Sequence, residues 1–255
     1  MHSPGLVKLE FDIDCVDTMK SDCTLTVITV YKNNLRDLLA TGMSLMMLEA
    51  NWIIVSGSGN DEELLRGNIL REFEYLPGPD RGIYHGMNRG IELAPKSSKM
   101  FWFLNAGDVN IYQGNRFQDQ IMKSNSVILF RMYNQETEKL NSSVFARFLL
   151  KSGIRPISHQ AVFFPSQFVF ANRYLEDIGN IADQEYILRA LEKFPLKTKK
   201  LVISYFQGHG AGSMNSSPAL FHEQIRLVSG GESNLAYKLS QAVRIVFRRR
   251  RLSRH

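Results

Sequence analysis

The chain has 255 residues, of which 44% are hydrophobic and 22% are charged, so its composition is that of a globular protein rather than a disordered one. No segment contains the roughly 18 consecutive apolar residues that a membrane-spanning helix needs, and the first residues lack the basic and apolar regions of a signal peptide. We therefore expect a cytoplasmic protein whose two cysteines, Cys15 and Cys23, are free thiols.

The net charge of +6 is concentrated at the C-terminal end. Residues 235–255 contain seven of the 31 basic residues and no acidic residue, which leaves 24 basic residues against 25 acidic ones elsewhere. Apolar residues recur in this segment at helical spacing, so we predict a basic amphipathic helix or tail over 231–255 that can lie on an anionic membrane surface. A solvated tail and non-specific nucleic-acid binding are the alternatives, and the near-neutral body argues against the second.

The first hundred residues alternate between apolar, β-branched strands and amphipathic helices. Asn34 and Asp61 precede the first two helices and are suited to cap them. This alternation predicts an α/β fold with a parallel sheet and right-handed crossovers. We expect strands at 25–31, 52–55, 73–76 and 100–104, and helices at 35–46, 62–69 and 83–94.

The pattern loosens after residue 108. Residues 134–158 and 165–181 look irregular, and segments of this kind commonly shape a substrate site. The remaining expected elements are strands at 127–132, 160–164 and 200–206 and a helix at 183–193.

The stretch 79–92 is rich in polar and glycine residues, which is unusual for a core helix. Asp80, Arg81, Tyr84 and Asn88 place a carboxylate, a guanidinium, a phenol and an amide in and just before the first turns of the expected helix. Tyr84 and Asn88 are four residues apart and share a helix face, and a helix N-terminus favours phosphate. A capped surface helix is the alternative, and we consider a ligand site the better explanation.

Further polar residues lie beside apolar segments. Asp108 follows the strand at 100–104, where a carboxylate either holds Mg²⁺ or Mn²⁺ or opens a turn. His159 precedes another apolar segment and is either a structural histidine or a substrate contact. Asp183 begins an amphipathic helix, so N-capping accounts for it locally, and His209 is a ligand or an exposed residue in a glycine-rich loop.

Taken in order, these segments resemble the family 2 glycosyltransferases with the GT-A fold, and closely those of colanic-acid and O-antigen biosynthesis. The resemblance implies a Rossmann-like, mostly parallel central sheet flanked by helices, in a domain spanning 1–230. Its nucleotide-sugar half would cover about 25–108 and its acceptor half about 109–215, followed by the basic helix. The matching segments are residues 27–33, 52–57, 79–91, 103–108, 159–165 and 182–183.

The resemblance also implies roles for individual residues. Asp183 matches the general base that deprotonates the acceptor hydroxyl, and Asp108 matches the last acid of a motif that binds Mg²⁺ or Mn²⁺, with His209 as a further metal ligand. The implied activity is that of an inverting hexosyltransferase that acts on a lipid-linked glycan in surface-polysaccharide biosynthesis, at the inner face of the membrane, without a specific nucleic-acid partner. Contacts with the nucleotide-sugar donor are implied for Thr29, Tyr31, Ser56, Asp80, Arg81, Tyr84, Asn88, Asn105, His159 and Gln160.

The sequence departs from the family pattern at four places, one of which is residues 210–213, where a late Gly-Gly-x-Ser motif is only approximated. Ser56 replaces an aspartate that would accept a hydrogen bond from a uracil-like base, His85-Gly86 replaces Asp-Ala, and Asn105 replaces the first acid of the metal motif. A nucleotide-sugar-binding protein without catalytic activity is therefore kept as an alternative.

Overall fold

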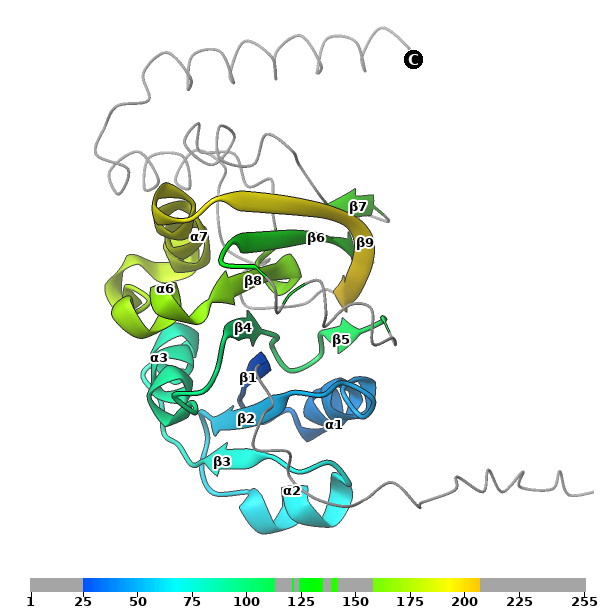
Figure 1. Cartoon of the computed structure of the whole chain (residues 1–255). Helices are drawn as coiled ribbons and strands as arrows, with labels where there is room; N and C mark the ends of the chain where they lie inside the picture. Colours follow the sequence, from blue (N-terminus) through cyan, green and yellow to red (C-terminus); the bar gives the residue numbers. More distant parts are fainter. Residues whose placement is uncertain (1–24, 113–120, 122–123, 135–138, 142–157, 207–255) are drawn as a thin grey trace, which may run out of the picture.

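The structure is a computed structural model that describes residues 25–112, 121, 124–134, 139–141 and 158–206 (Figure 1). Every structural statement below refers to these residues. The basic helix expected over 231–255 and the predicted metal ligand His209 lie outside them. None of the described helices is long and apolar enough to cross a membrane.

The strands form one nine-stranded sheet whose first half is parallel. In this half, β1 (Leu25–Tyr31) lies between β2 (Asn51–Ser56) and β4 (Met100–Phe103), and β3 (Glu74–Leu76) lies beyond β2. All three pairings are parallel. They confirm the α/β arrangement that the alternation of strands and helices predicts.

The second half of the sheet is mixed. β8 (Val162–Pro165) pairs antiparallel with β4 and with β6 (Val127–Asn134), and β6 pairs parallel with β9 (Leu196–Phe206). Two short strands that the sequence pattern does not predict, β5 (Val109–Asn110) and β7 (Lys139–Asn141), pair antiparallel with β9 and β6. The pairing of β4 with β8 therefore joins the two halves into one continuous sheet (Figure 1).

Helices cover both faces of the sheet (Figure 1). Two of them, α1 (Leu35–Ser44) and α2 (Glu62–Asn68), cover one face. The other face is covered by α3 (Ile83–Leu93), α6 (Ser166–Ala171) and α7 (Ala182–Lys193).

Alternate residues of β1 account for the two helical layers. Val27 and Tyr31 pack in a core cluster with Leu38 of α1, whereas Ile28 packs in a second cluster with Met87 of α3. Successive side chains of a strand point to opposite faces of the sheet. A strand whose residues are all buried, such as β1, therefore needs a layer of helices on each side.

The residues that the sequence predicts as helix N-caps are confirmed only in part. Asn34 caps α1 as expected, because its side-chain oxygen accepts the backbone N–H of Asp37 at 3.4 Å. Asp61 stands at the N-cap position of α2, but its side chain makes no capping hydrogen bond and instead accepts the phenol of Tyr31. The N-cap of α7 is Ile181, so Asp183 lies inside the first turn of that helix rather than before it.

The segment 165–181, which we expected to be irregular, is largely helical. It contains α6 and the short 3-10 helix η2 (Glu176–Ile181), which leads directly into α7. A further 3-10 helix, η1 (His159–Ala161), occupies the start of the strand expected at 160–164. These short elements were missed because a helix of six residues or fewer is too short to show a clear 3.6-residue period.

Candidate active site

Three predicted donor residues and the predicted metal ligand Asp108 lie at one edge of the parallel half of the sheet. Tyr31 and Ser56 end β1 and β2 and are register partners. Asn105 and Asp108 follow β4, and the backbone N–H of Ala106 donates to Val30 O, so the chain stays beside the end of β1. In open α/β sheets, ligands bind at this carboxyl edge of the strands.

Tyr31 and Ser56 form an internal network at this edge. The phenol of Tyr31 donates to Asp61 Oδ2 at 2.6 Å and is also hydrogen-bonded to the side chain of Ser56. Burial and the hydrogen bond to Asp61 raise the pKa of Tyr31 well above its usual range. Ser56 Oγ accepts the backbone N–H groups of Ser58 and Gly59 at 3.2 and 3.3 Å. Tyr31 therefore stays protonated, and these bonds fix the turn that follows β2.

Thr29 is placed differently from the other predicted donor residues. Its side chain is fully buried, and its hydroxyl oxygen accepts the indole N–H of Trp52 at 2.9 Å. The Thr29 side chain therefore stabilises the packing of β1 against β2, and it has no exposed surface for the predicted donor contact.

The carboxylate of Asp80 is held beside two glycines. A β-carbon at Gly57 would lie 2.7 Å from Asp80 Oδ2, and one at Gly86 would lie 3.1 Å from the same oxygen. The backbone N–H of Gly82 donates to Asp80 Oδ1 at 3.2 Å. Gly57 and Gly86 thus leave the space that the carboxylate occupies, which gives a physical reason for the glycine at position 86.

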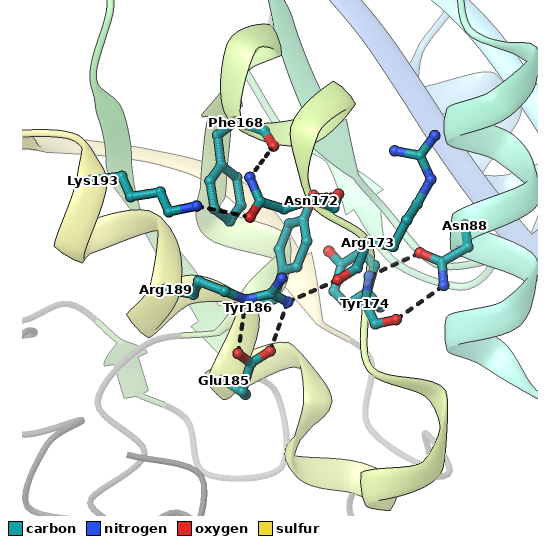
Figure 2. Close-up of polar contacts among 9 residues, drawn as sticks. All are labelled: Asn88, Phe168, Asn172, Arg173, Tyr174, Glu185, Tyr186, Arg189 and Lys193. Carbon is teal, nitrogen blue, oxygen red and sulfur yellow. Dashed lines mark hydrogen bonds and ion pairs between the residues drawn. The ribbon is translucent and has the colours of Figure 1, made fainter. Parts of the chain in front are cut away.

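Tyr84 and Asn88 of α3, and Arg81 just before this helix, contact Tyr174 and Glu176 in the segment 165–181. Asn88 is bonded to Tyr174 and Glu176 (Figure 2 shows the Tyr174 contact), and the ring of Tyr84 stacks on Tyr174 with centroids 5.6 Å apart. Arg81 has a largely exposed side chain whose Nη2 lies 3.4 Å from Glu176 Oε2. The shared face predicted for Tyr84 and Asn88 is confirmed, since both contact Tyr174.

Asp108 is a buried carboxylate. It is 3% exposed, and this burial raises the pKa of Asp108 to about 8. Hydrogen bonds from the Gln160 side chain and the Asn105 backbone act in the opposite direction and lower the pKa. Asp37 of α1 raises the pKa of Asp108 further by charge repulsion. The side-chain oxygen of Asn105 is buried without a hydrogen-bond partner among the described residues. These oxygen atoms suit a divalent cation such as Mg²⁺.

Few acidic side chains gather around this position. Within the part of the chain that the structure describes, no three His, Cys, Asp or Glu side chains lie close enough together to hold a metal ion. Asp37 is an acid that the sequence reading missed, although an acidic residue in the first turn of the helix after β1 was a visible signal. A cation at Asp108 would depend on ligands such as substrate phosphates and water.

His159 belongs to η1 and Asp183 to the first turn of α7. His159 is 3% exposed, and its Nε2 is 2.5 Å from the hydroxyl of Tyr174. Burial lowers the pKa of His159 to about 4, although the charge of Asp183 acts in the opposite direction. The imidazole is therefore neutral at pH 7. Asp183 Oδ1 accepts the backbone N–H of Gln184 at 2.7 Å in the first turn of α7.

Comparisons with known proteins identify the family. No family model matches the chain, but it is 30% identical over 225 residues to a Mycobacterium tuberculosis protein named uncharacterized glycosyltransferase Rv1514c, covering 82% of this chain and 84% of that protein. A crystal structure of S. aureus TarS superimposes with a TM-score of 0.61 at 15% identity, over 83% of this chain and 66% of that chain. A complex of TarS with UDP-GlcNAc gives a TM-score of 0.59 at 14% identity, over 83% and 67%.

The sheet and its helices have the GT-A architecture of glycosyltransferases. The chain belongs to the glycosyltransferase family. This confirms the family and fold expected from the sequence at the level of glycosyltransferases. The colanic-acid and O-antigen type stays a prediction.

Proposed function

We propose that the protein is an inverting glycosyltransferase that transfers a hexose from a nucleoside-diphosphate sugar to a lipid-linked glycan in surface-polysaccharide biosynthesis. The observation that carries the proposal is the pair of neighbours His159 and Gln160. Gln160 is hydrogen-bonded to the buried carboxylate of Asp108, and His159 lies close enough to Asp183 for its charge to act on the imidazole. One short segment thus lies between the two carboxylates that this chemistry requires.

The donor would bind at the carboxyl edge of β1, β2 and β4. UDP is the nucleotide to test first, because two structures of the similar protein TarS are complexes with UDP and UDP-GlcNAc. The exposed guanidinium of Arg81 precedes the N-terminus of α3, and both features favour a diphosphate. Asp80 lies beside this position and would face the nucleoside.

Asp108 and Asn105 would hold Mg²⁺ or Mn²⁺. The buried carboxyl group of Asp108, which a bound cation would keep ionised, and the side-chain oxygen of Asn105, unpaired among the described residues, are the oxygen ligands that these ions prefer. Mg²⁺ commonly uses one or two carboxylates together with substrate phosphates, so the small number of acids at this place fits such a site. A bound cation would offset the negative charge that develops on the departing diphosphate.

Asp183 would act as the general base. Its carboxylate would take the proton of the acceptor hydroxyl while the hydroxyl oxygen attacks the anomeric carbon of the donor sugar. The bond between that carbon and the diphosphate oxygen breaks in the same displacement, and attack from the opposite face inverts the anomeric centre. The neutral His159 adds no positive charge beside the base.

The proposed chemistry is tested with purified protein, a panel of nucleotide-sugars and Mn²⁺. Thermal shift identifies the donor, and release of the nucleoside diphosphate with and without acceptor glycans measures turnover. Asp183→Asn should lower turnover by about 100-fold or more while UDP binding is retained, because general-base catalysis contributes this much. Asp177→Asn, a change at an exposed acid of η2, is the matched control.

Each outcome of this assay has a clear meaning. Near-normal turnover by Asp183→Asn would contradict its role as the base. Turnover of any nucleotide-sugar by the parent protein excludes a binding protein without catalytic activity. If no nucleotide-sugar shifts the unfolding temperature or is turned over, the proposed function is wrong.

We also propose that residues 235–255 hold the enzyme at the cytoplasmic face of an anionic membrane. Support comes from the seven basic residues of this segment and from its apolar residues at helical spacing. Each basic residue near such a surface contributes about 1 kcal/mol. The full chain should co-sediment with vesicles that contain anionic phospholipid and not with neutral ones, whereas a chain truncated at residue 234 should stay in solution. Equal binding by the two chains would contradict the proposal.

A further inference from the structure

The backbone of residues 172–174, the connecting segment between α6 and η2, is held by side chains from two different helices (Figure 2). From α7, the hydroxyl of Tyr186 donates to the carbonyl of Asn172 at 3.3 Å, and Arg189 Nη2 donates to the carbonyl of Arg173 at 2.8 Å. Asn88 of α3 binds the backbone of Tyr174. Three consecutive residues are thus fixed to both α7 and α3.

The amide group of Asn88 is fully engaged by Tyr174 and Glu176, and Figure 2 shows its two bonds to the Tyr174 backbone. Its Nδ2 donates to the Tyr174 carbonyl at 3.0 Å and to Glu176 Oε1 at 2.9 Å, and its Oδ1 accepts the Tyr174 N–H at 2.9 Å. A side-chain amide has two N–H donors, and both are engaged here. Asn88 is also only 6% exposed, so it has no donor hydrogen left for a phosphate or a ribose.

The side chain of Tyr174 continues the connection toward Asp183. Its ring stacks on Tyr186 of α7 with centroids 3.8 Å apart and an interplanar angle of 16°, and its hydroxyl is 2.5 Å from His159 Nε2. The ring is 2% exposed, and the charge of Asp183 acts on it. Tyr174 therefore contacts both the helix that carries Asp183 and the histidine beside it.

An ion pair completes the attachment of α7 to this segment. Arg189 contacts both carboxylate oxygens of Glu185 at 2.8 Å while it donates to the connecting segment (Figure 2). Glu185 is buried and the Arg189 side chain is partly exposed, and their two-point contact holds the guanidinium in one orientation. The first turn of α7, with Asp183 in it, is consequently fixed relative to α3.

We propose that Asn88 and Tyr174 are positioning residues for Asp183, and that Asn88 does not contact the nucleotide-sugar. The inference rests on the proposed role of Asp183 as the general base. The resemblance implies that Asn88 contacts the donor. Here Asn88 instead connects α3 to the segment that holds α7 and Asp183 in place. A base that is displaced by about 1 Å can lose about 100-fold in rate without any loss of substrate binding.

The test separates nucleotide binding from base placement in the full-length protein. UDP affinity with Mn²⁺ is measured by calorimetry, amide hydrogen exchange is measured over 176–186, and kcat and donor KM are measured where turnover is found. Asn88→Ala should leave the UDP affinity within about twofold, raise exchange in the first turn of α7 and lower kcat about 10- to 100-fold. Glu92→Ala, at an exposed position of the same helix, should leave all of these values unchanged.

Two further variants keep the test informative if Asn88→Ala folds poorly. Tyr174→Phe removes only the hydroxyl bonded to His159, and should lower kcat while donor KM and UDP affinity stay constant. Asn88→Asp places a carboxylate against Glu176 and should increase exchange in α7, and the added change Glu176→Gln should partly restore protection because its amide donates to the new carboxylate.

The results that overturn the inference differ from those that overturn the proposed function. A tenfold or greater loss of UDP affinity in Asn88→Ala, or unchanged exchange across the first turn of α7, would overturn the positioning role, because both measurements are independent of turnover. Absence of turnover in the parent protein with every donor would overturn the proposed function, while calorimetry and exchange would still decide the role of Asn88.

Discussion

The carboxylate of Asp80 and the α-carbon of Gly86 lie so close that a β-carbon at Gly86 would be 3.1 Å from Asp80 Oδ2. The same β-carbon would lie 2.9 Å from Val30 Cγ1. One turn further along α3, a β-carbon at Gly90 would lie 2.6 Å from Ile28 Cγ2. The two glycines thus let α3 approach β1 closely, and this approach brings Asp80 against the carboxyl edge of the sheet.

We predict that Gly86→Ala destabilises the protein, although alanine is the better helix former. Alanine gains about 1 kcal/mol of helix propensity over glycine, whereas inserting a methyl group into a filled space costs about 1–3 kcal/mol. Urea unfolding should show a net loss. Gly67→Ala in α2, where a β-carbon would have no neighbour within 4 Å, is the matched control and should be neutral or stabilising. Equal effects of the two changes would contradict the close packing of α3 on β1.

We predict that His159 makes the folded protein less stable in mild acid. Its pKa is about 4 in the folded state against 6.5 ordinarily, so between these values the unfolded chain binds a proton that the folded chain does not. Stability is then full above pH 6.5 and falls as the pH decreases toward 4, by on the order of 3 kcal/mol in total.

The measurement for His159 is the free energy of unfolding at several pH values for the parent and for His159→Gln. The difference between the two proteins should change with pH across this window, because only the parent carries the titrating imidazole. Comparison with the variant is necessary because burial raises the pKa of Asp108 to about 8, and a raised carboxyl pKa gives a dependence of opposite sign. A constant difference would show that His159 titrates normally.

We predict that Asp108→Asn removes the dependence of nucleotide binding on a divalent cation. Asparagine has nearly the same size but lacks the charge that a cation at this site requires. In calorimetry, Mn²⁺ should increase the UDP affinity of the parent and have little effect on that of the variant. The control is a titration in EDTA, in which parent and variant should bind UDP alike. A full Mn²⁺ effect in the variant would exclude Asp108 as a ligand.

We predict that Tyr31→Phe loosens the turn that follows β2. The change leaves Asp61 without the phenol that donates to it at 2.6 Å, and a lost hydrogen bond to a charged group costs about 1.5–3 kcal/mol. Proteolysis within 57–61 should become faster, and the unfolding temperature should fall. Tyr205→Phe, which removes the hydroxyl of a ring stacked on Tyr133, should change neither value. Unchanged proteolysis in Tyr31→Phe would contradict the role of this bond.

The parallel half of the sheet and its polar edge could be predicted because they depend on local pattern and chain direction. Residues 52–55 are apolar and residues 25–31 are β-branched and almost fully apolar, and such runs indicate strands that are buried on both faces. Asn105 and Asp108 directly follow a parallel strand, so the edge on which they lie follows from the direction of the chain.

The contacts of individual polar residues could not be predicted in the same way. Asn88 binds backbone and side-chain groups that are 86 and 88 residues later in the chain, and nothing in the local pattern around Tyr174 marks it as a partner. Thr29 lies within a run of β-branched residues that look alike in sequence, yet its hydroxyl oxygen accepts the indole N–H of Trp52 in the core. Such outcomes depend on the packing of distant elements, which spacing and composition do not encode.

The continuous sheet also limits how this enzyme can diversify. Residues 25–28 of β1 pair with β4 on one side, and Phe163, Phe164 and Pro165 of β8 pair with it on the other. Recombination that exchanged β6, β8 and β9 for those of a relative would have to preserve this backbone pairing and the side chains packed around it, because the described strands form one sheet. We therefore expect new acceptor preferences to arise through substitutions at the ends of the strands rather than through exchange of modules.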